Sequence, residues 1–204
     1  MISQTINQLC LNLEKEFDFI PEERKALLSK LAIYIQGQKD KKQTIRLVYV
    51  CTHNSRRSHF GQIWANVAAN YFGINDVETF SAGTESTAFN PNAIAALKVQ
   101  GFIISKEDET SNPRYTVNFG TTEHAICFSK TIDDDSIPTS EFAAIMTCSD
   151  AEENCPFIPG VDLRIGTTYN DPKAFDGTPL QDEKYQERSL EIAKECLYTF
   201  SLIK

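Results

Sequence analysis

The chain has 204 residues, of which 41% are hydrophobic and 24% charged, and this size and composition suit one folded domain with its own core. Its net charge of −8 and pI of about 4.9 argue against a protein that attracts nucleic acid or anionic membrane over a distance, so an anionic ligand must be bound by a few local donors. The first residues lack the pattern of a signal peptide and no stretch is long enough to span a bilayer, so we expect a cytoplasmic protein whose six cysteines are thiols rather than structural disulfides.

Residues 1–43 predict two helices and a linker. Apolar residues recur at helical spacing between positions 2 and 13. Pro21 is a favourable first residue for a second helix, and Gly37 predicts its end. Residues 38–43 are polar and lysine-rich, which is typical of a linker. We expect residues 1–43 to form a helical extension that carries no chemistry and that covers the main domain or forms a homodimer contact.

From residue 44 onwards, strand patterns alternate with helix patterns. Residues 45–50 form a β-rich apolar run, as in a buried parallel strand, and an amphipathic helix follows the next loop and ends near Gly73. Further strands are expected at 77–81 and 142–146, and residues 115–119 and 125–128 predict strands or a hairpin. Further helices are expected after Asn90-Pro91 and over about 182–202. This alternation predicts an α/β domain over residues 44–204, with a parallel sheet in three layers and helices on both faces.

The loop after the first strand is the strongest candidate site. A junction from strand to helix directs backbone N–H groups at a ligand above the helix N-terminus, where the helix dipole adds about half a positive charge. Cys51 begins the loop, and the same field favours its thiolate, the nucleophilic form of a cysteine. Arg57 can bind two oxygens of a tetrahedral oxyanion through its planar guanidinium. The oxyanion is expected to contact Thr52, His53, Asn54, Ser55, Arg56, Arg57 and Ser58.

Some loop residues have more specific expected roles. Ser58 can offer its hydroxyl to the sulfur of Cys51, and Asn54 can bridge backbone groups of the loop. His53 is expected to be a loop residue rather than a catalytic base. Arg56 either strengthens the positive field or is a solvated charge.

A second cysteine motif is the run Thr147-Cys148-Ser149-Asp150-Ala151-Glu152-Glu153-Asn154-Cys155-Pro156. Cys148 follows a predicted strand, so it should lie at the same edge of the sheet as Cys51, where ligands of open α/β sheets bind. The spacing between Cys148 and Cys155 indicates little by itself. The polar segment between the two predicts a loop that can rearrange.

The loop at Cys51 resembles that of the low-molecular-weight protein tyrosine phosphatase superfamily, which includes the thioredoxin-coupled arsenate reductases. The run Ser81-Ala82-Gly83-Thr84-Glu85 and the later Asn90-Pro91 are similar to the same family. The segment Cys148 to Cys155 and the pair Asp171-Pro172 resemble the arsenate reductases in particular. The resemblance spans about residues 45–200 and implies a phosphatase-like fold, to which residues 1–43 add the helical extension.

For the arsenate reductases, the resemblance implies a relay of three thiols. Cys51 attacks the arsenic of arsenate, which the loop and Arg57 hold, while Asp171 helps an oxygen to leave as water. Cys148 then attacks Cys51 and releases arsenite, and Cys155 attacks Cys148 to form a disulfide that thioredoxin reduces. No tightly bound cofactor is implied. No metal is expected either, because Gln62 stands where some reductases use a glutamate to bind potassium.

Two other functions stay open. A phosphatase of this family would use Cys51 to take a phosphoryl group from phosphotyrosine and Asp171 to protonate the leaving phenolate. Such phosphatases usually carry aromatic residues just after the Asp-Pro, whereas this chain has Lys173-Ala174-Phe175. A sensor that binds an oxyanion or arsenite without turnover is the third possibility. The presence of both Arg57 and Asp171, which a catalytic site needs, argues against it.

Overall fold

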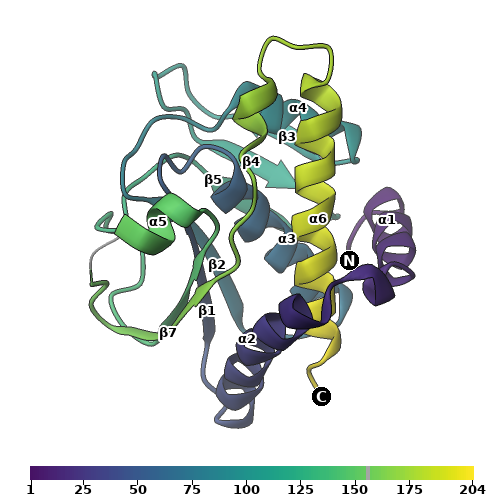
Figure 1. Ribbon diagram of the computed structural model, residues 1–204, viewed down its shortest axis with the longest axis vertical. Coiled ribbons are helices and arrows are strands. Elements are labelled where there is room, and N and C mark those ends of the chain that lie inside the picture. The colour runs from purple at the N-terminus through teal and green to yellow at the C-terminus, as the bar shows by residue number, and fades with distance from the viewer. Residues whose placement is uncertain (155–156) are drawn as a thin grey trace.

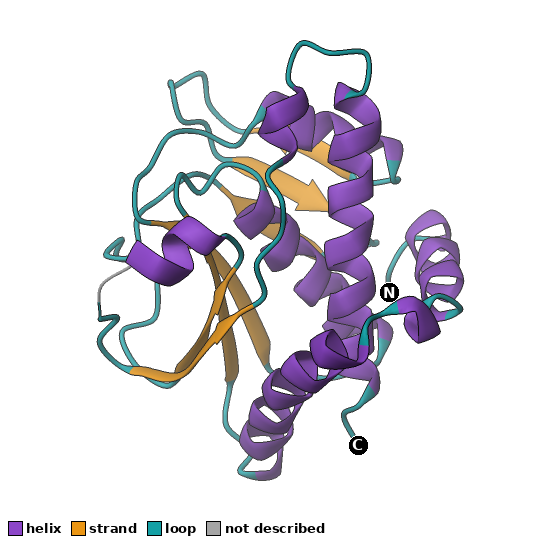
Figure 2. Ribbon diagram, viewed as in Figure 1, coloured by secondary structure: helices purple, strands orange, loops and turns teal. Residues whose placement is uncertain are grey.

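The computed structural model describes residues 1–154 and 157–204 (Figures 1 and 2). The helices are α1 (Gln4–Glu14), α2 (Glu22–Asp40), α3 (Arg57–Tyr71), α4 (Pro91–Val99), α5 (Ser149–Asn154) and α6 (Gln181–Ser201), with 3-10 helices η1 (Phe17–Phe19) and η2 (Pro172–Phe175). The strands are β1 (Ile45–Cys51), β2 (Val77–Gly83), β3 (Ile103–Lys106), β4 (Tyr115–Asn118), β5 (His124–Cys127), β6 (Phe142–Met146) and β7 (Val161–Gly166). Within these ranges, no helix is both long and apolar enough to cross a membrane.

The main sheet has four parallel strands in the order β2-β1-β6-β7. Strand β1 lies inside the sheet, with Val50 opposite Ala82 of β2 and Met146 of β6. Helices or loops cover both faces of β1 and β6, which explains why these strands are continuous apolar runs instead of alternating ones. The carboxyl ends of β1 and β6 therefore meet at one edge of the sheet, as the sequence predicted.

The sheet separates two hydrophobic clusters. On one face, side chains such as Leu47 and Tyr49 pack with the buried faces of α3 and α6, which stand to the right of the strands in Figures 1 and 2. On the other face, Val48 and Val50 pack with Ala151 of α5 and with residues of the loops around it. The predicted α/β fold, a parallel sheet flanked by helices on both faces, is thus confirmed.

A second sheet is antiparallel and has the order β3-β4-β5. Of the two alternatives expected for residues 115–119 and 125–128, strands or a hairpin, the structure has the hairpin, formed by β4 and β5. Strand β3 was missed because its residues are half-buried or exposed and carry no apolar alternation. Strand β7 was also missed, although Val161, Leu163 and Ile165 alternate with polar residues over this short segment; only Ile165 in it is buried.

Residues 1–43 differ from their prediction at the end of the second helix. Gly37 does not end α2, which continues to Asp40. The reason is a tertiary contact: Gln38 is buried and donates hydrogen bonds from Nε2 to the hydroxyl of Tyr34 and to the carboxylate of Asp162. Residues 38–40 of the expected linker are therefore the end of a helix, and residues 41–43 connect it to β1.

Candidate active site

The loop between β1 and α3 begins after Cys51 and ends at Arg57, the first residue of the helix. Its backbone carbonyls point outward and are bonded to the surrounding chain. The carbonyl of Thr52 accepts from the N–H of Glu85 at 2.8 Å, and that of Ser55 accepts from the N–H of Asn90 at 3.0 Å. The carbonyl of His53 accepts from the hydroxyl of Ser129 at 3.0 Å. These bonds fix the curl of the loop from outside.

The N–H groups of the same loop are left available. Among the described residues, those of positions 52–56 donate no backbone hydrogen bond. Successive backbone N–H groups that are left unused form a concavity that binds anions. The N-terminus of α3 adds its dipole at the same place.

Asn54 and Ser58 connect this loop to the sulfur of Cys51. Ser58 Oγ lies 3.1 Å from Cys51 Sγ, the contact expected from the sequence, and Asn54 Nδ2 donates to the same hydroxyl at 2.8 Å. Asn54 Oδ1 accepts from the N–H of Lys130 at 2.8 Å. Asn54 also adopts a φ of +42°, a left-handed conformation that asparagine tolerates better than most residues. Its side chain and its backbone thus both hold the curl of the loop.

Gly83 allows the loop to lie against the end of β2. A Cβ atom at this position would lie 2.4 Å from the carbonyl oxygen of Glu85, 2.7 Å from that of Thr52 and 2.8 Å from the N atom of Asn54. All three are backbone atoms, which cannot move aside as a side chain could. The glycine of the Ser81–Glu85 run is therefore required by close approach of two backbones.

Arg57 is held by two acceptors on the segment before η2. Its Nη2 donates to Asp171 Oδ2 at 2.7 Å and its Nη1 donates to the carbonyl of Tyr169 at 2.8 Å. Its Nε is buried and has no acceptor among the described residues. A buried donor without an acceptor costs free energy, and an oxyanion in the loop would supply one.

Asp171 is itself fixed by the backbone. It caps η2, with Oδ1 accepting from the N–H of Lys173 at 3.0 Å. The predicted Asp171 and Arg57 are thus neighbours, 114 positions apart in the chain. Tyr169 is anchored in turn, because its hydroxyl donates to Glu195 at 2.6 Å and Glu195 accepts from Arg24 Nε of α2 at 2.8 Å.

Arg56 and His53 differ in how they are held. Arg56 Nε donates to the hydroxyl of Tyr185 at 2.8 Å, and the same hydroxyl donates to Asp176 at 2.8 Å, so Arg56 belongs to a network and is not a solvated charge. The side chain of His53 is 45% exposed and its closest charged partner is Glu85 at 3.6 Å. It does not contact Cys51 Sγ, in agreement with a loop residue.

Cys148 lies beside the loop. Its sulfur is 3.4 Å from the hydroxyl of Thr52, which immediately follows Cys51, and it accepts a hydrogen bond from the N–H of Ala151. The segment after it is the short helix α5, not the loop that the sequence predicted. Two features explain the helix: Cys148 Sγ bonds an N–H of its first turn, and Asp150 and Glu152 favour its positive end. Cys155 lies outside the described residues.

The other cysteines are unsuited to nucleophilic chemistry. Burial raises the pKa of Cys10, Cys127 and Cys196 to about 12, so these thiols stay protonated at neutral pH. Within residues 1–154 and 157–204, no group of three or more His, Cys, Asp or Glu residues is arranged to hold a metal ion.

Several residues that hold the site were not predicted. Tyr169 and Lys130 bind Arg57 and Asn54 through backbone atoms, and a backbone atom leaves no residue signature in a sequence. Ser129 and Tyr185 act through hydroxyls, but they lie far along the chain from the loop. Only Gly83 had a signal, as part of the run that the resemblance singled out.

Known proteins with similar sequences are arsenate reductases. No protein-family model matches the chain. The arsenate reductase of Brevibacillus brevis is 32% identical over 133 residues, which cover 65% of this chain and 79% of the relative. The arsenate reductase of Bacillus subtilis is 29% identical over 139 residues, 68% of this chain and 81% of the relative. The arsenate reductase of Staphylococcus aureus strain Newman is 29% identical over 149 residues, which cover 73% of this chain and 92% of the relative.

Solved structures with the same fold include both enzyme types. An arsenate reductase in the phosphate-binding state superposes with a TM-score of 0.53 at 17% identity, covering 78% of this chain and 99% of the other. A low-molecular-weight protein tyrosine phosphatase from T. tengcongensis superposes with a TM-score of 0.51 at 16% identity, covering 76% and 96%. At these identities the likeness establishes the fold.

Proposed function

Because the chain belongs to the arsenate reductase family within the low-molecular-weight phosphatase superfamily, we propose that it reduces arsenate to arsenite through Cys51, Cys148 and Cys155. Arsenate and phosphate are tetrahedral oxyanions of similar shape, and the unused N–H groups at positions 52–56 suit such a ligand. Arg57 adds two kinds of donor: Nη atoms now held by Asp171 and Tyr169, and the unsatisfied Nε.

The first step is attack by the Cys51 thiolate on arsenic(V). An S–As bond forms, and one oxygen takes up protons and leaves as water. Asp171 is the proton donor that the geometry offers, since it lies against Arg57. While Arg57 holds its carboxylate, Asp171 accepts hydrogen bonds, so it must leave the guanidinium before it can carry a proton. An oxyanion that competes for the same guanidinium would cause that release.

The second step is attack by Cys148 on the sulfur of Cys51. An S–S bond forms, the S–As bond breaks, and its electron pair goes to arsenic, which leaves as arsenite, arsenic(III). In the third step Cys155 attacks Cys148, so that the Cys51 thiolate is released and a Cys148–Cys155 disulfide remains. An external dithiol must then reduce this disulfide. Thioredoxin is the donor proposed for this, in a reducing cytoplasm.

The observation that carries the proposal is the position of Cys148. Its sulfur contacts Thr52, the residue next to the nucleophile, from the end of a neighbouring strand. A phosphatase has no use for a thiol there, because water completes its cycle. A sensor without turnover needs no proton donor, whereas here Asp171 lies against the oxyanion-binding Arg57.

A coupled assay tests the proposal. Purified protein is given arsenate, thioredoxin, thioredoxin reductase and NADPH, and NADPH oxidation is followed beside aryl phosphate hydrolysis. We expect Cys51→Ser to abolish both activities. Cys148→Ser should stop arsenate turnover and leave any aryl phosphate hydrolysis largely intact. Cys127→Ser is the matched control, because that thiol is buried and its pKa is about 12, and it should retain wild-type turnover.

Phosphotyrosine hydrolysis is the second candidate function. It is favoured by the same loop and by the cap position of Asp171, which are also sufficient for a phosphocysteine route. Brisk aryl phosphate hydrolysis by the wild type without any arsenite would overturn the reductase and establish the phosphatase.

A further inference from the structure

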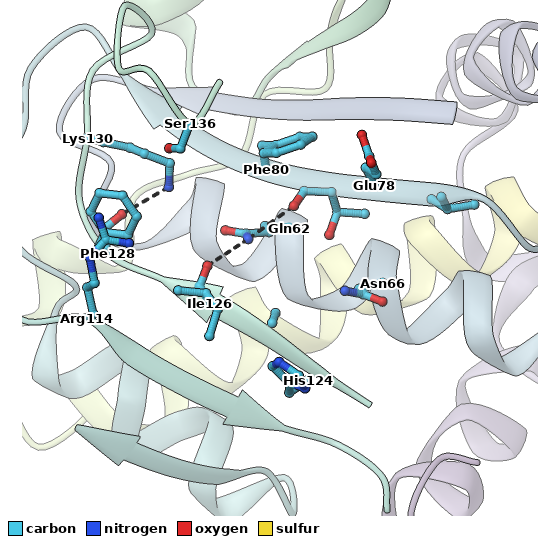
Figure 3. Close-up of a pocket in the computed structure, with 13 residues that line it drawn as sticks. Gln62, Asn66, Glu78, Phe80, Arg114, His124, Ile126, Phe128, Lys130 and Ser136 are labelled. Carbon is cyan, nitrogen blue, oxygen red and sulfur yellow. Dashed lines mark hydrogen bonds between the residues drawn. The ribbon is translucent and has the colours of Figure 1, made fainter. Parts of the chain in front are cut away.

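A second pocket lies outside the Cys51 loop, between the outer edges of the two sheets (Figure 3). Strand β2 ends the parallel sheet and β5 ends the antiparallel one, and α3 spans the gap between them. Gln62 of α3 donates from Nε2 to the carbonyl of Thr79 in β2 at 3.2 Å and to that of Ile126 in β5 at 3.1 Å. The pocket has a volume of about 470 Å³, and no residue from 51 to 58 lines it.

Three basic side chains line this pocket: Lys130, Arg114 and His124. Lys130 is only 4% exposed, and its Nζ donates to the carbonyl of Phe128 at 3.3 Å and lies 4.1 Å from the centre of that ring. The guanidinium of Arg114 lies 3.9 Å from the centre of the same ring. In the described part of the chain, no carboxylate lies within 4.0 Å of either cation.

The acidic residues nearby are already engaged. Glu78 lines the pocket, but its carboxylate pairs with Arg46 at 3.1 Å. Asp134 is close enough to act on Lys130, and its carboxylate accepts from the N–H and the hydroxyl of Ser136. Burial lowers the pKa of Lys130 from 10.5 to about 8, so the protein bears the cost of an ammonium group whose charge Asp134 offsets only in part.

A buried hydroxyl of the pocket also lacks a partner. Thr79, which is 9% exposed and lines the pocket, has an Oγ1 with no hydrogen-bond partner among the described residues. The apolar part of the wall includes Val77, Phe80 and Ile126, and the polar side chains of Gln62, Asn66 and Ser136 lie beside it. A few unsatisfied polar groups within apolar walls are typical of a site for a small ligand.

We propose that this pocket binds a small organic anion, with its carboxylate or sulfonate group on Lys130 and Arg114 and its apolar body against Phe80 and Ile126. A bound anion would offset the cost of the buried ammonium. Charge-assisted hydrogen bonds to the two cations would hold its head group. The ligand class follows from this lining alone and is separate from arsenate chemistry.

The test uses the aromatic sulfonate 8-anilino-1-naphthalenesulfonate as probe and its fluorescence as readout. We expect the full-length protein to bind one molecule per chain. Lys130→Met should weaken binding at least tenfold and still fold, because a buried charge replaced by an apolar residue of similar size is neutral or stabilising. Arg114→Gln, at an exposed position, should weaken it as well. Lys106→Met, at an exposed lysine of β3, is the matched control and should bind as the wild type does.

Two further binding measurements establish where the probe binds and whether its sulfonate is needed. Inorganic phosphate, which we propose the Cys51 loop binds and which lacks an apolar body for the second pocket, should not displace the probe. The uncharged N-phenyl-1-naphthylamine, which has the same rings without the sulfonate, should bind at least tenfold more weakly. Any of three results would overturn the proposal: displacement of the probe by phosphate, equally tight binding of the uncharged probe, or unchanged probe binding by both Lys130→Met and Arg114→Gln.

Discussion

At the scale of single residues, the guanidinium of Arg57 decides whether an oxyanion can be held. Its planar fork offers parallel donors that a lysine ammonium cannot reproduce. We expect Arg57→Lys to lower kcat/KM for arsenate on the order of a hundredfold, as for the loss of one preorganised oxyanion donor. Arg56→Lys is the neighbouring control and should cost far less, since Arg56 donates to Tyr185 and lies 4.0 Å from Asp171, whereas Arg57 lies 2.7 Å from it. Steady-state kinetics check this, and an effect of only a few fold at Arg57 would contradict the assignment.

Lys130 gives a second test at this scale, through the pH dependence of stability. Below pH 8 its side chain is charged in both the folded and the unfolded protein, so the folded state bears the full cost of burial. Between pH 8 and 10.5 the folded protein has lost the proton that the unfolded chain still holds, and this cost declines as pH rises. It is gone above 10.5, and a pKa difference of this size corresponds to about 3 kcal/mol.

Lys130→Met should therefore be more stable than the wild type at pH 7, and its advantage should shrink between pH 8 and 10.5. Chemical denaturation at three pH values measures the difference in the free energy of unfolding. The other titrating groups are common to both proteins, so they cancel. A difference that does not change with pH would show that the Lys130 ammonium is well solvated or neutralised.

At the scale of elements, helix α2 is connected to the catalytic loop. Arg24 of α2 pairs with Glu195, whose other oxygen accepts from the hydroxyl of Tyr169, and the carbonyl of Tyr169 holds Arg57. We expect Arg24→Met to reduce kcat/KM about tenfold by displacing Tyr169, because small misplacements of a binding group are costly. Lys30→Met, at an exposed position of the same helix, should be neutral. Equal kinetics for the two variants, both folded by circular dichroism, would disprove the connection.

The elements also show what can be predicted from the sequence. The order of most strands and helices follows from contiguous patterns of apolar residues. The loop at Cys51 could be predicted because its residues, Cys51 to Ser58, are consecutive in the sequence. Strand β3 is short, mostly exposed and without apolar alternation, and β7 alternates only over Val161, Leu163 and Ile165, of which Ile165 alone is buried. The supports of Arg57 come from segments more than a hundred positions away, and a chain pattern cannot reveal contacts that tertiary packing alone creates.

At the scale of the whole molecule, the boundary between residues 1–43 and 44–204 stays a prediction. Helices α1 and α2 contribute Ile6, Leu13, Leu31 and Ile35 to the same cluster as α3 and α6. Each fully buried aliphatic side chain contributes about 1.5–3 kcal/mol, so together they approach the stability of a typical domain. We propose that residues 44–204 alone lose cooperative folding, as thermal denaturation would show. An unchanged midpoint after truncation would mean that the extension is independent.

The central claim for the molecule is that three thiols act in series, and a single-turnover experiment with Cys155→Ser tests it most directly. The reduced variant is mixed with arsenate, quenched with a thiol-alkylating agent and digested for peptide mapping, while arsenite is counted. Without the third thiol, the relay should stop after its second step. We predict about one arsenite per enzyme and a disulfide between Cys51 and Cys148. Repeated turnovers driven by thioredoxin, or a disulfide that omits Cys51, would contradict the relay.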